Sequence, residues 1–274
     1  MVKKSLGQNF LVDEGVVGRI VREVAPRADE TIVEIGAGRG ALTAQLVGRV
    51  GRLVAVEFDR DLVPLLSERF GAREDFTLVE ADALALDFCA AVHPARASRV
   101  VANLPYNIST AILQRLFEQR HCLTEMILML QREVVERITA APGTSERGYL
   151  SVLTEAYCEA RALFDVAPQA FRPVPKVWST VVRLSVRERV AAGVADEALL
   201  WRVVSAGFAQ RRKTILNNLR HAPSALLVQV DAAGGASALL ERAKVEPQRR
   251  AETLTLAEWA QISRELETTS GRDA

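Results

Sequence analysis

The chain has 274 residues, of which 49% are hydrophobic and 25% are charged. This composition is typical of a globular protein with one large domain and a smaller one, and it excludes low-complexity disorder. Its 35 lysines and arginines against 34 acids give a net charge of +1, which does not by itself favour a nucleic-acid partner. Neither a signal or transit peptide nor a membrane span is visible, so we expect a cytoplasmic protein.

Cysteine and histidine are scarce and widely spaced. Cys89, Cys122 and Cys158 form no CxxC pair and have no metal-ligand spacing, and we interpret them as buried thiols. The three histidines form no HExxH or similar group. We therefore expect no metal site.

Short apolar runs typical of buried strands alternate with helical patterns from about residue 14 to residue 187. The predicted strands are Thr31–Ile35, Arg52–Glu57, Phe76–Glu80, Ser98–Ala102 and Glu125–Gln131. Helical spacing or a connecting turn is predicted near 41–49, 61–70, 83–92 and 109–119. This alternation predicts an α/β fold with a parallel, doubly wound sheet. Two further strands, Ala160–Val166 and Ser179–Arg187, are joined by a proline-rich connection and predict an antiparallel hairpin at one end of that sheet.

The pattern changes near residue 188, after which no convincing strand is visible. Helices are predicted near 196–209, 212–219, 236–243 and 255–267. The last of them begins with a capping-box pattern, in which Thr255 is followed three residues later by Glu258. We therefore predict a catalytic domain over residues 1–188 and a helical domain over residues 189–274.

A glycine-rich turn follows the first predicted strand. Gly36, Gly38 and Gly40 let a ligand approach the backbone at the carboxyl edge of the sheet, where doubly wound folds bind ligands. The spacing is GxGxG, not the GxGxxG that seats a dinucleotide pyrophosphate, which weakens the case for a nicotinamide cofactor without excluding it. A tight turn without a ligand is the alternative.

Acidic residues end the second and third of these strands. Glu57 lies about twenty residues after the glycines, where an acid can accept hydrogen bonds from both hydroxyls of a ribose. A helix-capping role is the alternative, and Asp59 or Asp61 fits that role better. Asp82 can accept from the exocyclic amine of an adenine, although turns after strands often carry an aspartate for other reasons.

The segment Asn103-Leu104-Pro105-Tyr106 ends the fourth strand. An adenine N6 amine is a poor nucleophile because its lone pair is delocalised into the ring, so a site has to accept its hydrogens and orient it. The Asn103 amide oxygen and the Leu104 carbonyl can accept those hydrogens. Pro105 stiffens the turn, and Tyr106 offers a flat face for a base. A β-turn with a chance aromatic is the alternative.

Together with two flanking motifs, these residues resemble the ribosomal RNA adenine N6-dimethyltransferases. The upstream motif is LGQNFL at residues 6–11, and the downstream motif is FRPVPKVWS at residues 171–179. The resemblance runs from residue 4 to about residue 220 and includes FAQRRKTILNNL at residues 208–219. It implies a Rossmann-like class I S-adenosylmethionine-dependent methyltransferase sheet with a small all-helical C-terminal domain.

The resemblance also implies roles for individual residues. The cofactor S-adenosyl-L-methionine would contact Asn9, Leu11, Gly36, Glu57, Asp82 and Asn103. The target adenine would be held by Asn103, Leu104, Pro105 and Tyr106, with Phe171 stacked on its opposite face. The implied substrate is a pair of adjacent adenosines in the hairpin near the 3′ end of 16S rRNA, within the immature small ribosomal subunit. Resistance-type methyltransferases of large-subunit rRNA are the alternative, which the stretch 208–219 and the helical C-terminal region disfavour.

A basic, acid-free stretch between residues 201 and 221 is the candidate RNA-binding surface, because clustered cations bind phosphates whatever the net charge. A solvated helical face is the alternative. The cations are Arg202, Arg211, Arg212, Lys213 and Arg220, with Lys3, Lys4, Arg172 and Lys176 as further candidates.

Two other classes of protein remain open at this point. A nicotinamide-dependent oxidoreductase would share the glycine turn and Glu57 but would leave residues 103–106 unexplained. A non-catalytic ribosome-assembly factor would keep the fold and bind immature subunits through basic helices alone. We expect no membrane partner and a monomer, since no exposed apolar helix suits a symmetric interface.

Overall fold

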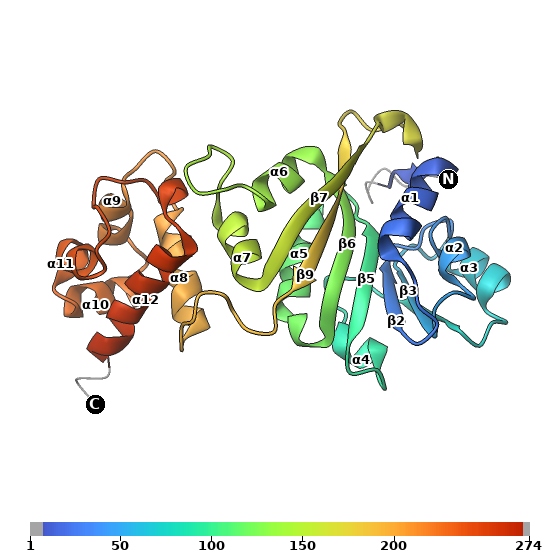
Figure 1. The fold of residues 1–274 in the computed structure, drawn as a ribbon, viewed down its shortest axis with the longest axis horizontal. Helices are drawn as coiled ribbons and strands as arrows, with labels where there is room; N and C mark the ends of the chain where they lie inside the picture. The colour runs from blue at the N-terminus through green and yellow to red at the C-terminus, as the bar shows by residue number, and fades with distance from the viewer. Residues whose placement is uncertain (1–7, 271–274) are drawn as a thin grey trace. The chain divides into compact units, whose positions relative to one another are not determined.

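The computed structural model describes residues 8–270 and contains a seven-stranded sheet with the order β4-β3-β2-β5-β6-β9-β7 (Figure 1). The strands are β2 (Thr31–Ile35), β3 (Arg52–Glu57), β4 (Phe76–Glu80), β5 (Ser98–Asn103), β6 (Leu123–Gln131), β7 (Cys158–Val166) and β9 (Ser179–Val186). The pairs from β4 to β6 are parallel, and β9 pairs with β6 in the antiparallel sense. The predicted doubly wound sheet is therefore confirmed, and β9 and β7 complete one end of it.

Two short strands, β1 (Phe10–Leu11) and β8 (Phe171–Arg172), pair outside the main sheet. Their antiparallel register places Leu11 opposite Phe171. Strands of two residues carry no periodic signal, so the sequence did not predict them. This pairing brings the end of the upstream motif, Phe10 and Leu11, next to the start of the downstream motif, Phe171 and Arg172.

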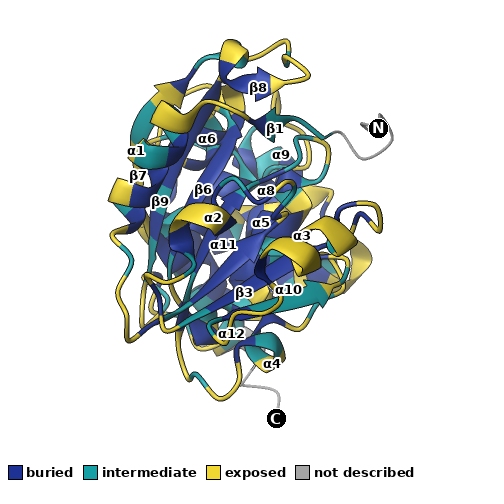
Figure 2. Cartoon of the chain, turned by 90° about the vertical axis from the view of Figure 1, so that its right-hand side faces the viewer, coloured by how far each residue is buried: buried dark blue, intermediate teal, exposed yellow. Residues whose placement is uncertain are grey.

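The helices that follow the strands are short, apart from α1 and α5. They are α1 (Glu14–Val24), α2 (Thr43–Leu46), α3 (Val63–Phe70), α4 (Phe88–Val92) and α5 (Ser109–Glu118). In α1, Val17, Ile20, Val21 and Val24 recur at helical spacing and are buried in the core. Asp13 begins the helix by accepting a hydrogen bond from the backbone of Val16 at 3.0 Å. Figure 2 shows buried strands and exposed outer faces on α2 and α3.

The chain folds into two compact units, one of residues 8–135 and 159–186, the other of residues 136–158 and 187–270. The helices of the second unit are α7 (Tyr149–Tyr157), α8 (Glu197–Gly207), α9 (Ile215–Arg220), α10 (Ser224–Ala232), α11 (Gly235–Arg242) and α12 (Leu256–Ser270), and α6 (Arg132–Ile138) begins in the first unit and ends in the second. The sequence missed α6, α7 and α10. It also did not show that residues 136–158 group with the C-terminal helices, because that grouping depends on tertiary contacts. The functional domains 1–188 and 189–274 stay a prediction.

The predicted capping box of α12 is confirmed. The backbone N–H of Thr255 donates to the Glu258 carboxylate at 2.8 Å, and the backbone N–H of Glu258 donates to the Thr255 hydroxyl at 3.2 Å. The two residues therefore satisfy backbone donors that the first turn of the helix leaves free.

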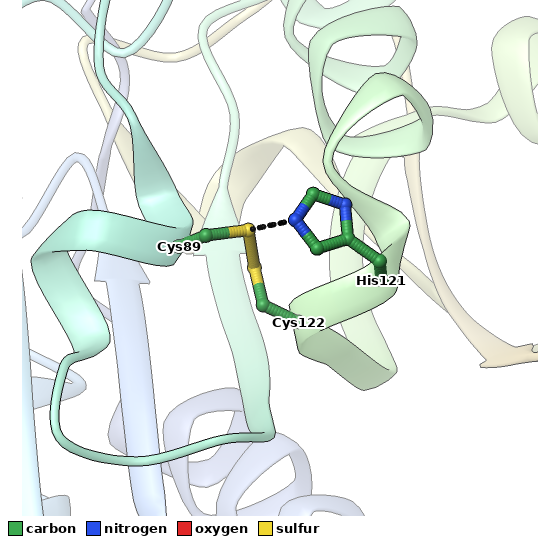
Figure 3. A group of neighbouring side chains, drawn as sticks. All are labelled: Cys89, His121 and Cys122. Atoms are coloured by element: carbon green, nitrogen blue, oxygen red, sulfur yellow. Dashed lines mark hydrogen bonds between the residues drawn. A yellow bond between two sulfur atoms is a disulfide. The ribbon is translucent and has the colours of Figure 1, made fainter.

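The interpretation of all three cysteines as thiols is wrong for two of them. Cys89 in α4 and Cys122 in η2 (Arg120–Cys122) form a disulfide, with their Cα atoms 5.5 Å apart (Figure 3). Cys158 is a buried free thiol, as expected. Spacing in the sequence could not show that α4 and η2 lie side by side in the fold.

Candidate active site

A pocket of about 260 Å³ lies at the carboxyl ends of β2, β3 and β5, within the unit that holds the sheet. Open α/β sheets bind their ligands at this edge. Most of the predicted cofactor and target-base residues line it together: Asn9, Gly36, Glu57, Asp82, Asn103, Leu104, Pro105 and Tyr106. The sequence therefore placed the principal motifs in one site.

Two of the three glycines of the turn after β2 line the pocket in backbone conformations that favour glycine. Gly36 has φ +72° and Gly38 has φ +61°, both in the left-handed region. A Cβ added to Gly38 would lie 3.4 Å from the ring of Phe10, which also lines the pocket. The turn thus brings backbone, not side chains, to the pocket wall, and Phe10 closes over it.

Glu57 is held in place by the backbone. Its Oε1 accepts from the N–H groups of Phe58 at 2.9 Å and Asp59 at 2.8 Å. Its Oε2 accepts from the N–H of Gly38 at 2.8 Å. A carboxylate has about four acceptor positions, so one on Oε2 is left for a ligand. The carboxylate is therefore held at the pocket wall with acceptor capacity left on Oε2, and the contact of Glu57 with a ribose stays a prediction.

Glu34, which sequence reasoning missed, is a buried acid next to the glycine turn. It is 2% exposed and accepts a hydrogen bond from the Thr43 hydroxyl at 2.6 Å. Burial raises the pKa of Glu34 from 4.5 to about 8; the hydrogen bonds from Thr43 oppose this rise and the charge of Glu57 adds to it. The carboxyl group is therefore mainly protonated at neutral pH. An acid inside an otherwise apolar strand was the signal that could have revealed it.

Asp82 follows β4 and is exposed at the pocket wall. Its Oδ1 accepts from the backbone N–H of Leu84 at 2.9 Å, so the side chain stabilises the turn, as the alternative interpretation proposed. The residue also lines the pocket, so the two roles are compatible.

The segment after β5 is anchored at several points. Asn103 donates through Nδ2 to the backbone carbonyl of Asn9 at 3.1 Å, which leaves its amide oxygen as the acceptor for a ligand. The Leu104 N–H donates to the Met129 carbonyl at 3.2 Å, so the turn is tied to β6. These bonds fix the amide that the sequence predicted to face the target amine.

Tyr106 is fixed through its hydroxyl group. The Tyr106 Oη and Ser179 Oγ atoms are 2.8 Å apart, which joins the segment after β5 to the start of β9. Burial raises the pKa of the Tyr106 phenol above its usual value, against the opposing effect of the Ser179 hydrogen bond. The phenol therefore stays neutral, and its hydroxyl is held by Ser179 while the residue lines the pocket.

Two predicted residues do not line the pocket. Leu11 is buried in the apolar core, and Phe171, opposite it in β8, has an exposed fraction of 0%. Stacking of Phe171 on a base would require its ring to leave the core, so that role stays a prediction. The proline-rich connection after β8 instead exposes Trp178, at 49%, next to the Ser179 that binds Tyr106. Sequence reasoning missed this aromatic.

The predicted cations lie in the helical unit, and three of them form a turn between α8 and α9. Asn218 is buried and donates from Nδ2 to the carbonyls of Gly207, at 2.5 Å, and Gln210, at 3.2 Å. Arg211 also donates to the carbonyl of Ser145. These hydrogen bonds fix the conformation of the turn. Its residues line a hollow: Gln210, Arg211, Arg212 and Lys213. All five predicted cations are exposed: Arg202, Arg211, Arg212, Lys213 and Arg220.

The alternative interpretation, a solvated helical face, required these cations to lie on a helix. Three of them, Arg211, Arg212 and Lys213, lie on a fixed turn instead. Of the further candidates, Arg172 and Lys176 lie in the first unit. Lys3 and Lys4 lie outside the described residues. Within residues 8–270, no helix is long and apolar enough to cross a membrane.

The sheet order, the glycine turn and the pocket at the carboxyl edge define a Rossmann-like class I methyltransferase with a helical C-terminal part. The model of the ribosomal RNA adenine dimethylase family matches residues 1–266. The chain belongs to this family and is therefore an rRNA adenine dimethyltransferase.

Individual relatives match along almost the whole chain. Ribosomal RNA small subunit methyltransferase A of Hahella chejuensis is 44% identical over 261 residues, which cover 95% of this chain and 91% of that protein. The protein of the same name from Pseudomonas aeruginosa is 42% identical over 264 residues, covering 96% and 94%.

Solved structures share the fold. A dimethyladenosine transferase from Plasmodium falciparum superimposes with a TM-score of 0.81 at 21% identity, over 95% of this chain and 98% of that one. The 23S rRNA methyltransferase ErmE superimposes with a TM-score of 0.69 at 25% identity, over 94% and 100%.

Proposed function

We propose that this protein transfers methyl groups from S-adenosyl-L-methionine to N6 of two adjacent adenosines in the hairpin near the 3′ end of small-subunit rRNA, during assembly of the small ribosomal subunit. The observation that carries the proposal is the anchored segment Asn103–Tyr106, which lines a pocket of about 260 Å³ at the carboxyl edge of the sheet. The choice of the small subunit is supported by the names of the relatives that match nearly the full chain.

The residues of the pocket fit a sulfonium nucleoside cofactor. Glu57 offers its remaining acceptor position to a ribose hydroxyl, and Asp82 lies at the wall where an adenine amine would be received. Ile35, Val56 and Ile112 supply apolar surface for the adenine ring. When bound, S-adenosylmethionine supplies a methyl group activated by the positive sulfur.

The protein's own contribution is to position the target amine. The Asn103 amide oxygen accepts one hydrogen of the adenine N6 amine, which favours a nitrogen lone pair directed out of the ring plane. The Leu104 carbonyl, in the same turn, accepts the other. Tyr106 supports the base through its ring face, because its hydroxyl is already bound to Ser179. Once methylated, the nitrogen loses its proton to water, so no strong base is needed.

Binding of the RNA is assigned to the cations of the helical unit. Phosphate contacts position a nucleic acid and depend on local charge, which explains how a chain of net charge +1 binds RNA. The fixed turn Arg211–Lys213 presents three adjacent cations without a neighbouring acid in the sequence. We also propose that the protein is cytoplasmic and monomeric.

The experiment is methyl transfer from labelled S-adenosylmethionine to purified ribosomal subunits that lack these methyl groups. Small subunits should become labelled, whereas large subunits should not. Asn103→Ala should lower the rate by about 100-fold or more while cofactor binding stays within a few fold of the parent. Gln248→Ala, an exposed polar change in the helical unit, is the matched control and should keep the parental rate.

Each rival function gives a different result in this assay. A non-catalytic assembly factor would bind small subunits without transferring label. An oxidoreductase would bind NADH in preference to S-adenosylmethionine. Labelling of large subunits alone would replace the small-subunit assignment, and an Asn103→Ala protein that retains the parental rate would remove Asn103 from the mechanism.

A further inference from the structure

A second group of reactive side chains lies outside the pocket. Cys89 in α4 and Cys122 in η2 form the disulfide, and His121 lies beside it with Nε2 3.2 Å from the Cys89 sulfur (Figure 3). The two sulfurs differ in access, since Cys122 is 5% exposed whereas Cys89 is half-buried and His121 is exposed. None of the three lines the pocket.

We propose that Cys89 and Cys122 form a reversible thiol–disulfide pair that exchanges with small thiols and disulfides such as glutathione. Cys89 is the reactive sulfur, and His121 is its positioning residue. The inference rests on the proposed cytoplasmic location, where a small-thiol pool keeps accessible disulfides in exchange. It does not depend on the methyl-transfer reaction.

The surroundings of the sulfurs assign the reactive one. Both lie near the backbone carbonyl of Gln119, 3.5 Å from Cys89 and 3.2 Å from Cys122. A carbonyl oxygen favours the thiol over the thiolate, because it repels negative charge. Only Cys89 also has an imidazole nitrogen at hydrogen-bond distance, and when Nε2 of His121 carries a hydrogen, it can donate to the thiolate, the form that attacks disulfides.

The exchange balances in two steps. In oxidation, the Cys89 thiolate attacks one sulfur of the small disulfide, so that a mixed disulfide forms and one small thiolate leaves. The Cys122 thiolate then attacks the Cys89 sulfur, the protein disulfide forms and the second small thiolate leaves. The two protons of the protein thiols pass to the two released thiolates, and two electrons pass from the protein to the small disulfide. Reduction by two small thiols reverses both steps.

The fold keeps this junction together without the disulfide, which permits exchange in the native state. The Gln119 side chain, which is almost fully buried, accepts from the backbone N–H of Phe88 at 2.6 Å and donates to the carbonyl of Leu86 at 2.9 Å. These bonds connect the end of α5 to the segment that carries Asp82 to the pocket. Cofactor binding should therefore persist in both redox states.

The test equilibrates the full-length protein in glutathione buffers from fully reduced to fully oxidised, followed by acid quenching, alkylation and peptide mass spectrometry. Cys89 and Cys122 should change together in one two-electron transition, and Cys158→Ser should show the same transition. In the reduced protein, Cys89 should react with the alkylating reagent roughly tenfold faster than Cys122, and His121→Ala should slow it by about as much. His93→Ala, a change at another exposed histidine, should leave the rate unchanged.

Several results would overturn the proposal. If the disulfide stays closed in every glutathione buffer, it is a structural bond. If Cys89 and Cys122 stay reduced in every buffer, they do not form an exchange pair. Equal alkylation rates at Cys89 and Cys122, or a His121→Ala rate equal to the parent's, would remove the assigned roles. If the reduced protein takes up one equivalent of zinc and Cys89 and Cys122 then resist alkylation, these residues form a metal site and not an exchange pair. Methyl transfer measured on the same samples separates a failure of this inference from a failure of the proposed function.

Discussion

The buried acid Glu34 makes the stability of this protein depend on pH in a direction opposite to that of most carboxylates. In the folded chain its pKa is raised from 4.5 to about 8, with burial as the main cause. Between these two values the folded state holds a proton that the unfolded state has lost. The free energy of unfolding therefore falls as pH rises through this window and levels off above it.

The size of this effect follows from the shift. At 1.36 kcal/mol per pKa unit, Glu34 lowers the free energy of unfolding by about 3 kcal/mol at pH 7 and by roughly 5 kcal/mol above pH 8, relative to acid conditions. A Glu34→Gln protein keeps a neutral side chain of similar size and an acceptor for the Thr43 hydroxyl, so this contribution disappears. Between pH 5 and pH 9, the free energy of unfolding of the parent should therefore fall by about 4 kcal/mol relative to that of the variant.

Urea unfolding followed by circular dichroism at pH values from 5 to 9 measures this difference. Glu159→Gln, a change at an exposed glutamate of β7, is the matched control and should follow the parent at every pH. If the parent and Glu34→Gln curves stay parallel, or if the parent gains stability relative to the variant as pH rises, Glu34 is ionised in the folded protein at neutral pH, contrary to this prediction.

Three other changes test the site and the RNA surface. Reversing charge at Arg211 and Arg212 should weaken small-subunit binding and reduce the slope of log K against log salt by about 2, with cofactor affinity unchanged; an unchanged slope removes this turn from the interface. Gly40→Ala should destabilise the protein by about 1–3 kcal/mol, because φ is +77° and the new Cβ would lie 2.8 Å from the Phe70 ring, and a thermal melt equal to the parent's would contradict this. Tyr106→Ala should lose most methyl transfer whereas Tyr106→Phe should retain most of it, since the ring face supports the base; equal losses in rate assays would assign the role to the hydroxyl instead.

The charge-reversal experiment has a matched control in the other unit. Arg96→Glu with Arg161→Glu changes the net charge by the same amount at exposed positions of the sheet unit. If this control weakens binding as much as the change at Arg211 and Arg212, the effect reflects overall charge and not a local surface.

The sequence predicted the sheet well because its central strands β2, β3 and β5 are buried along most of their length and its strands are bounded by turns. The ranges Thr31–Ile35, Arg52–Glu57 and Phe76–Glu80 coincide with β2, β3 and β4. Residues at strand ends could be placed together because parallel strands share one carboxyl edge. The glycine turn, Glu57, Asp82 and the segment after β5 therefore meet in one pocket, as expected.

What the sequence could not show depends on contacts between distant segments. The β1–β8 pair, which buries Phe171, and the Cys89–Cys122 disulfide each join elements that no local pattern connects. The number of acceptor positions left on Glu57 depends on three backbone donors whose positions only the fold determines. Trp178 was missed because an exposed aromatic has the same local pattern as one that faces a core.

The most direct test of the proposed function is to locate the methyl groups on the product. Small subunits lacking these methyl groups are incubated with the purified protein and S-adenosylmethionine, and the 3′-terminal rRNA fragment is digested and sequenced by mass spectrometry. We predict N6,N6-dimethyladenosine at two adjacent positions of the 3′-terminal hairpin, absent when Asn103→Ala replaces the parent protein. Methyl groups at any other position, or only in large-subunit RNA, would contradict it.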